Sequence, residues 1–167
     1  MASIFGHSLV GYVLAKVQNK QSRLLIVLAI LSTILPDFDV IGFYFGVSYN
    51  DPLGHRGFTH SIVFAVLWTL ILVWFFQKKY RIRYGIVIFL ATLSHSILDA
   101  LTNGGKGVGF FIPFDNTRYF FGYRPIEVSP IGIKRFFSMW GLEVILSELL
   151  WVGLPCLIIL LFNKFRK

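Results

Sequence analysis

The stretch DPLGHRGFTHS, residues 51–61, concentrates side chains that can bind a metal ion, move a proton or hold an anion. Its eleven residues include one Asp, two His, one Arg and two hydroxyl groups, and long apolar runs lie on both sides. Further residues of the same kinds occur elsewhere: His7, Asp37 and Asp39 in LPDFD, and His95 and Asp99 in SHSILD. The sequence therefore supplies imidazole nitrogens and carboxylate oxygens from four separate segments.

A set of His and Asp residues without a thiolate is typical of a divalent metal site. Neutral imidazoles and carboxylate oxygens suit zinc or manganese. His95 and Asp99 are four residues apart, so a helix places them on one face. The single cysteine, Cys156, cannot form a multi-thiolate zinc site, and we expect it to be a small buried hydrophobe. A mixed nitrogen and oxygen set favours a catalytic site, because water can occupy an open position.

Arg56 and the glycine-rich stretch NGGKGVG, residues 103–109, are the two features that could bind phosphate. The planar guanidinium of Arg56 could hold a phosphate, or it could pair with Asp51 or a backbone carbonyl, and both alternatives stay open. The 103–109 stretch lacks the Gly-Lys-Ser/Thr ending and a preceding strand of a phosphate-binding loop. We therefore interpret it as a flexible loop.

The composition indicates a membrane protein. Of the 167 residues, 56% are hydrophobic and 14% charged, and the mean hydropathy is +0.70, whereas soluble chains carry roughly 45–50% apolar and about 25% charged residues. Lipid is therefore the expected solvent, and the length fits one domain over residues 1–167. The net charge of +8 does not indicate nucleic-acid binding, because the basic residues cluster at the ends of apolar runs.

Four apolar runs can enter a bilayer, whose hydrocarbon core takes roughly 20 helical residues to cross. They cover residues 23–47, 61–76, 84–101 and 141–162. Residues 3–17 form a shorter helix candidate, either re-entrant or interfacial, without the basic start of a cleaved signal peptide. We therefore predict an all-α polytopic integral membrane protein with about four transmembrane helices plus a short N-terminal helix.

Basic residues predict the orientation. Three segments without acidic residues contain ten of them: Lys16, Lys20 and Arg23; Lys78, Lys79, Arg81 and Arg83; Lys164, Arg166 and Lys167. By the positive-inside rule these segments, including the C-terminus, are cytoplasmic, and the opposite helix ends face outward. All four His and four of the five Asp then converge on the outer side. The aromatic-rich stretch 110–124 is expected to anchor the outer loop at the level of the lipid headgroups.

This convergence predicts a functional site. Ionisable groups in membrane segments cost roughly 2.5–3.5 kcal/mol each, and several together repel one another unless a cation compensates them. We therefore predict one or two divalent metal ions, zinc before manganese. Two alternatives stay open: an ion- or proton-coupled transporter, and a non-catalytic membrane scaffold. The stretches LLIVLAIL and LWTLILVWFF carry no charge, which counts against a polar pathway through the whole bilayer.

The early His, LPDFD, HRGFTHS and SHSILD together resemble the YdjM-like family of LexA-regulated, membrane-bound, metal-dependent hydrolases. The resemblance covers residues 1–103 well and the remainder weakly. It implies a protein of a bacterial or archaeal inner membrane with divalent-metal hydrolase activity, and a distant likeness to zinc-dependent phospholipase C. Position by position it points to seven residues: His7, Asp37, Asp39, His55, His60, His95 and Asp99.

We therefore expect a membrane-bound hydrolase that cleaves an ester, above all a phosphoester of a lipid at the outer leaflet. The expected metal ligands are His60, His95, Asp39 and Asp99, with His7 and Asp37 completing the site or bridging a second ion. The expected catalytic residues are His55 as acid and base or as a further ligand, Arg56 as the phosphate-binding group, and Asp37. A membrane lipid is the expected partner, and the sequence does not specify an oligomeric state.

Overall fold

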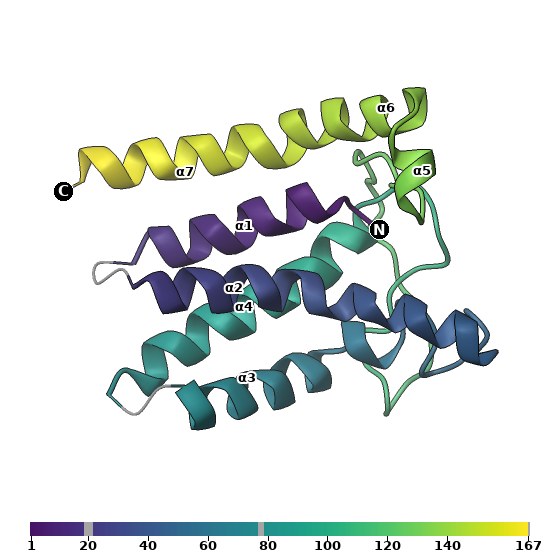
Figure 1. The fold of residues 1–167 in the computed structure, drawn as a ribbon, viewed down its shortest axis with the longest axis horizontal. Helices are drawn as coiled ribbons and strands as arrows, with labels where there is room; N and C mark the ends of the chain where they lie inside the picture. The colour runs from purple at the N-terminus through teal and green to yellow at the C-terminus, as the bar shows by residue number, and fades with distance from the viewer. Residues whose placement is uncertain (19–21, 77–78, 167) are drawn as a thin grey trace.

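The computed structural model describes residues 1–18, 22–76 and 79–166 and shows an all-α bundle (Figure 1). The first four helices are α1 (Ile4–Lys16), α2 (Arg23–Ile34), α3 (Ile62–Phe76) and α4 (Arg81–Ala100). The C-terminal helix comprises α6 (Met139–Glu148), the π-helical turn η3 (Leu149–Gly153) and α7 (Leu154–Phe165). Shorter elements are the 3₁₀ helices η1 (Leu35–Phe45) and η2 (Phe58–His60), and α5 (Ile133–Phe136). The predicted all-α class is confirmed.

Within the part of the chain that the structure describes, three helices are long and apolar enough to cross a membrane: Arg23–Phe45, Arg81–Ala100 and Met139–Phe165. The remaining predicted run forms α3, whose 15 residues span only about 22 Å. That length is less than the roughly 30 Å of a bilayer's hydrocarbon core. The polytopic membrane class is therefore confirmed, with three helices of full spanning length and α3 as a shorter apolar helix.

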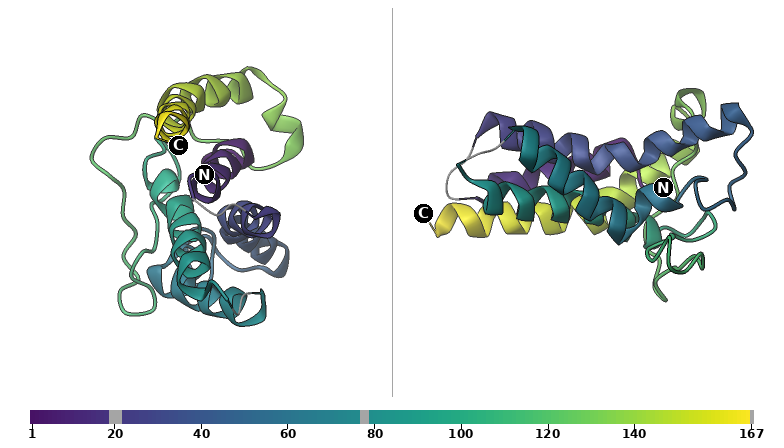
Figure 2. Two further views of the ribbon diagram at one scale, coloured as in Figure 1. Left: turned by 90° about the vertical axis from the view of Figure 1, so that its left-hand side faces the viewer. Right: turned by 90° about the horizontal axis from the view of Figure 1, so that it is seen from below.

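Helix α1 packs inside the bundle, against α2, α4 and α7. The end-on view shows it between the C-terminal helix and α2 (Figure 2). A Cβ added at Gly11 would lie 2.9 Å from the carbonyl oxygen of Ala29 on α2. Small residues at such an interface let two helix backbones approach closely, which is how helices associate in lipid. The close approach of α1 and α2 brings His7 beside the polar ends of the other helices.

The described parts of the three acid-free basic segments lie at one end of the bundle, and the segments that carry the metal-binding residues lie at the other (Figure 1). The described basic residues of the three segments lie at or near the ends of α1, α2, α4 and α7: Lys16, Arg23, Lys79, Arg81, Arg83, Lys164 and Arg166. Lys20, Lys78 and Lys167, which belong to the same segments, lie outside the described residues. The His and Asp residues lie at the other end, where α2 passes into η1 and α4 ends.

Pro36 changes the winding of the second helix at the position where its carboxylates begin. Proline has no N–H, so it cannot form the α-helical hydrogen bond to the carbonyl four residues earlier. The chain continues as the 3₁₀ helix η1, with Pro36 in its first turn. A 3₁₀ helix has three residues per turn, so Asp37 and Asp39 lie on different sides of it. The two carboxylates therefore face different partners.

Candidate metal centre

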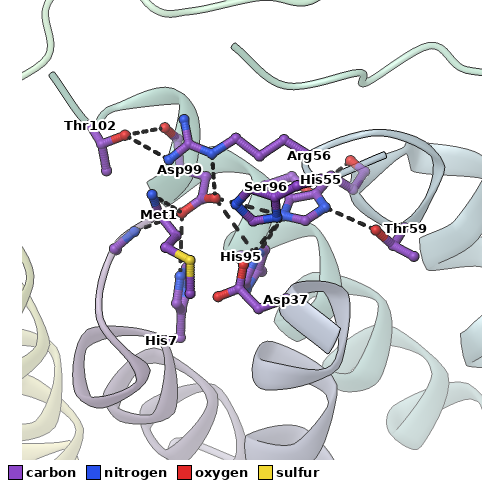
Figure 3. Close-up of polar contacts among 12 residues, drawn as sticks. Met1, His7, Asp37, His55, Arg56, Thr59, His95, Ser96, Asp99 and Thr102 are labelled. Atoms are coloured by element: carbon purple, nitrogen blue, oxygen red, sulfur yellow. Dashed lines mark hydrogen bonds and ion pairs between the residues drawn. The ribbon is translucent and has the colours of Figure 1, made fainter. Parts of the chain in front are cut away.

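Four ligand atoms from three elements, η1, η2 and α4, meet at one end of the bundle (Figure 3). His60 Nε2 lies 2.9 Å from His95 Nε2. Asp37 Oδ1 lies 3.7 and 3.4 Å from these two nitrogens, and Asp99 Oδ2 lies 3.6 and 3.9 Å from them. Ligands about 2.0–2.1 Å from a tetrahedral zinc ion would be roughly 3.4 Å from one another. The observed distances therefore bracket the edge of a zinc tetrahedron.

The hydrogen bonds of the two imidazoles leave both Nε2 atoms free to bind a cation. His95 Nδ1 donates to the carbonyl oxygen of Thr33, at 2.7 Å. Thr59 Oγ1 donates to Asp39 Oδ2 and can therefore accept from His60 Nδ1, which lies 3.0 Å away. With the proton on Nδ1, each neutral ring carries its lone pair on Nε2, as in most metal-binding histidines.

The carboxylates complete the same arrangement. Asp37 Oδ1 and Asp99 Oδ2 are buried, and their close neighbours are the two imidazole nitrogens and, for Asp99 Oδ2, Arg56 Nε at 3.0 Å. Two buried carboxylates in one site repel each other unless positive charge compensates them. Here the two carboxylate oxygens lie 3.4–3.9 Å from the two imidazole nitrogens, which is close to the spacing between ligands of one metal ion. The residues present therefore fit a divalent cation.

A proton competes with a metal ion for this position. Burial lowers the pKa of His60, but hydrogen bonding with Asp37, Asp39 and Asp99 outweighs burial and raises the pKa to about 10. At neutral pH and without a metal ion, His60 is therefore an imidazolium. Metal binding must displace this proton, because a metal ligand must be deprotonated.

Asp39 contacts the outer side of His60 instead of the four-atom group. Its carboxylate accepts hydrogen bonds from His55 Nδ1 at 2.6 Å, from Thr59 Oγ1 at 2.7 Å and from the backbone N–H of Arg56 at 3.0 Å. Asp39 and His55, together with His60, form a second group with ligand-like spacing. Because both oxygens of Asp39 already accept hydrogen bonds, the geometry favours Asp39 as the residue that orients His60 and His55.

Arg56 is fully buried, and its guanidinium contacts three groups. Nε lies 3.0 Å from Asp99 Oδ2, Nη1 donates to the carbonyl oxygen of Gly104, and Nη2 donates to Thr102 Oγ1. Of the two alternatives that the sequence left open, the structure contains the pairing with a carboxylate and a carbonyl. The carboxylate is Asp99, whereas the sequence suggested Asp51.

The stretch 103–109, which we interpreted as a flexible loop, packs closely against Arg56. Gly105 has φ +90°, and a Cβ added there would lie 2.5 Å from Arg56 Nη1. Only glycine adopts such a backbone conformation without strain, and only glycine leaves room for the guanidinium. The glycines of this stretch therefore position Arg56.

His7 lies beside the four-atom group. Its ring stacks on His95, with centroids 3.9 Å apart. His7 Nε2 is 3.4 Å from Asp99 Oδ1, which also accepts the backbone N–H of Ala2. Neither ring nitrogen of His7 forms a hydrogen bond among the described residues. His7 is therefore available to the metal centre from the α1 side.

Glu148 anchors the N-terminal segment that leads to His7. Its carboxylate accepts hydrogen bonds from the backbone N–H and the hydroxyl of Ser3, which caps α1. Glu143 is exposed, and Cys156 is buried as predicted. Glu148 thus contributes to the site through the position of α1.

All eight residues that the sequence singled out lie in one cluster: His7, Asp37, Asp39, His55, Arg56, His60, His95 and Asp99. The sequence did not identify Thr33, Thr102 or Ser96, whose hydroxyl donates to the carbonyl oxygen of His60. Thr59 and Ser96 had a signal, since they lie within HRGFTHS and SHSILD. The other contacts join residues far apart in the chain and leave no local pattern.

A pocket of about 280 Å³ adjoins the cluster. Its lining includes His55, Arg56, Tyr49, Arg135 and Trp140. Because Arg56 also contacts Asp99, the lining of the pocket touches a candidate metal ligand. A small polar group bound in the pocket would therefore lie next to the metal centre.

Comparison with known proteins identifies relatives along almost the whole chain. The family model described as YdjM inner membrane protein matches residues 1–166. Inner membrane protein YbcI of Escherichia coli (strain K12) is 42% identical over 141 residues, which cover 83% of this chain and 82% of that protein. No solved structure matches significantly. Together with its apolar helices, this similarity indicates a bacterial inner membrane protein, and the chain belongs to the YdjM inner membrane protein family.

Proposed function

We propose that this protein is a membrane-bound, metal-dependent hydrolase that cleaves a phosphoester of a lipid. One observation carries the proposal: two imidazole Nε2 atoms and two buried carboxylate oxygens lie within 4.8 Å of one another. His60, His95, Asp37 and Asp99 would hold a divalent ion, zinc before manganese. When bound, such an ion polarises a phosphoryl oxygen and lowers the pKa of a water to about 7.

His55 is the residue best arranged to move a proton. Its Nδ1 donates to Asp39, so in the neutral ring Nε2 is free to accept a proton. An imidazole oriented by a carboxylate is a common arrangement for general acid–base catalysis. His55 also lines the 280 Å³ pocket. It would therefore meet a substrate at the edge of the metal centre.

Arg56 and Asp37 have complementary roles in the proposal. Arg56 supplies a buried positive charge beside Asp99 and stabilises negative charge that develops on a phosphate nearby. The Asp37 side chain is 12% exposed, whereas the other three ligand side chains are fully buried. Asp37 therefore marks the open side of the metal centre.

The apolar half of the bundle supports a hydrolase over a transporter. Between the site and the basic end, the core consists mainly of apolar side chains: Ala15, Leu25, Leu28, Ala29, Leu72, Tyr84, Val87, Ile88 and Ala91. A transporter for ions or protons needs polar groups along the whole path. The described polar cluster instead stops at one end.

The charge distribution supports a site that faces the outer leaflet. The three acid-free basic segments, as far as the structure describes them, lie at the opposite end of the bundle, which the positive-inside rule assigns to the cytoplasm. The C-terminus would then be cytoplasmic, and the site would lie at the level of the outer headgroups. An ester bond of a phospholipid is found at that depth.

The test is metal content and hydrolysis in the purified full-length protein. We expect about one or two equivalents of zinc per chain. Cleavage of phospholipids, followed by mass spectrometry, should stop with a chelator and in His95→Ala. Lys134→Gln, an exposed substitution in α5, serves as a control that keeps both metal and cleavage.

Two results would contradict the proposal in different ways. Unchanged metal content in His60→Ala, His95→Ala and Asp99→Ala would contradict the proposed metal site. Efficient cleavage of soluble phosphoesters, with no lipid cleaved, would contradict the lipid substrate but agree with a hydrolase function.

A further inference from the structure

An apolar groove lies next to the 280 Å³ pocket beside the metal centre. We call it the α1–α5 groove; its volume is about 330 Å³, and its apolar lining includes Ile4, Phe5, Pro130, Phe136 and Phe137. Met1 and Ser129 line both the groove and the 280 Å³ pocket. The two cavities are therefore neighbours on either side of Met1 and Ser129, one apolar and one polar.

The aromatic residues of the groove are open to the surroundings. Phe5 is 61% exposed and Phe137 is 83% exposed. The ring of Phe5 lies 5.9 Å from that of Phe136, so the start of α1 and α5 approach each other across the groove. Exposed apolar side chains are ordinary on a membrane protein. Their position next to a polar pocket distinguishes these residues from the other exposed apolar side chains.

The pocket at the end of the groove is suited to an anion. None of its described lining residues is acidic, and Arg135 is exposed on α5 beside Arg56. The charge of Arg56 is balanced by Asp99, whereas no ion pair involving Arg135 occurs among the described residues. An arginine fork binds phosphate oxygens well. A ligand that fits both cavities therefore has an anionic group next to an apolar chain.

We propose that these two neighbouring cavities bind one phospholipid, with an acyl chain in the α1–α5 groove and the phosphate beside Arg135 in the 280 Å³ pocket. The combined volume lies within the range of about 300–1,000 Å³ that is usual for ligand sites. The phosphate would lie next to His55 and Arg56, at the edge of the metal centre. The role of this lipid as the substrate rests on the proposed hydrolase function, but its binding does not.

Photolabelling of the purified full-length protein tests the binding. The probe is a phosphatidylglycerol with a diazirine halfway along one acyl chain, used after chelator treatment so that no turnover occurs. We expect label on residues 4–5 and 136–137, and loss of this label when unlabelled phosphatidylglycerol is added. Arg135→Gln should weaken the competitor about fivefold, whereas the neighbouring Lys134→Gln, which lines neither cavity, should have no effect.

A second pair of variants tests the groove itself. Phe137→Ser should reduce the competed label severalfold. Phe165→Ser is the matched control, because Phe165 is 84% exposed but lies at the other end of the bundle. Equal labelling of all apolar helices without competition would overturn the proposal, even if the protein hydrolyses phosphoesters. Competition by glycerol phosphate as strong as that by the lipid would overturn the acyl-chain assignment. If unlabelled lipid competes with the label but the protein cleaves no phosphoester, the proposed function is contradicted and the lipid-binding site is supported.

Discussion

Replacing Asp39 by asparagine distinguishes an orienting residue from a metal ligand. The two oxygens of Asp39 accept hydrogen bonds from His55, Thr59 and the backbone of Arg56, and Thr59 contacts His60 Nδ1. The amide oxygen of asparagine can still accept the hydrogen bonds from Thr59 and from the backbone N–H of Arg56. Its NH₂ group then faces His55 Nδ1, so the neutral His55 ring must carry its proton on Nε2 instead. The substitution therefore removes the negative charge behind His60 without emptying the site.

Loss of such an outer carboxylate usually lowers metal affinity about 10–100-fold, which corresponds to roughly 1.4–2.8 kcal/mol. We expect Asp39→Asn to weaken zinc binding by this amount, measured by competition with a chromophoric chelator. His95→Ala, which removes a candidate ligand, should lose most of the bound zinc. Asp115→Asn should leave the affinity unchanged, because the Asp115 carboxylate contacts Thr117 and Tyr119 and no candidate ligand. If Asp39→Asn loses as much zinc as His95→Ala, then Asp39 is a direct ligand and the orienting role is wrong.

Three further predictions follow from the same geometry. The pKa of His60 is raised to about 10, so zinc binding at pH 7 should release the proton of His60. Titration calorimetry in buffers of different ionisation enthalpy measures this release, and the zinc affinity should fall as the pH is lowered. Gly105→Ala should destabilise the protein by about 1–3 kcal/mol, because φ is +90° and an added Cβ would lie close to Arg56 Nη1. The melting temperature in detergent should fall. Gly122→Ala should leave it unchanged, because an added Cβ there has nothing within 4 Å. A reporter fused at Lys106 should be periplasmic, and a cytoplasmic signal there would reverse the proposed orientation.

The membrane class could be predicted from the sequence because it depends on local composition. The apolar runs predicted the helices of the bundle, and the acid-free basic segments predicted which helix ends lie together. The grouping of the His and Asp residues followed from the same two patterns. A helix places its ends at a distance fixed by its length, so residue spacing along the chain was sufficient for this level of detail.

The length of α3 and the packing of α1 depended on more than hydropathy. Residues 61–76 are as apolar as a spanning helix, yet the helix has only 15 residues. Residues 3–17 looked interfacial or re-entrant, but Gly11 lets α1 pack against Ala29 inside the bundle. Hydropathy reports the preference of a segment for lipid, whereas small residues at a contact decide how closely two helices approach.

Which carboxylate meets which imidazole was decided by the tertiary structure. Asp37 and Asp39 are two residues apart and equally suited to a metal, and the helical winding of η1 turns them toward different sides. Arg56 contacts Asp99 rather than the nearby Asp51 because its backbone has φ +61° and Gly105 leaves space for its guanidinium. The sequence alone determined that a bacterial membrane protein would gather His and Asp residues at one end. The distances between ligand atoms depend on the rotation of each helix about its axis and on single backbone angles, and these are fixed only when all the helices pack together.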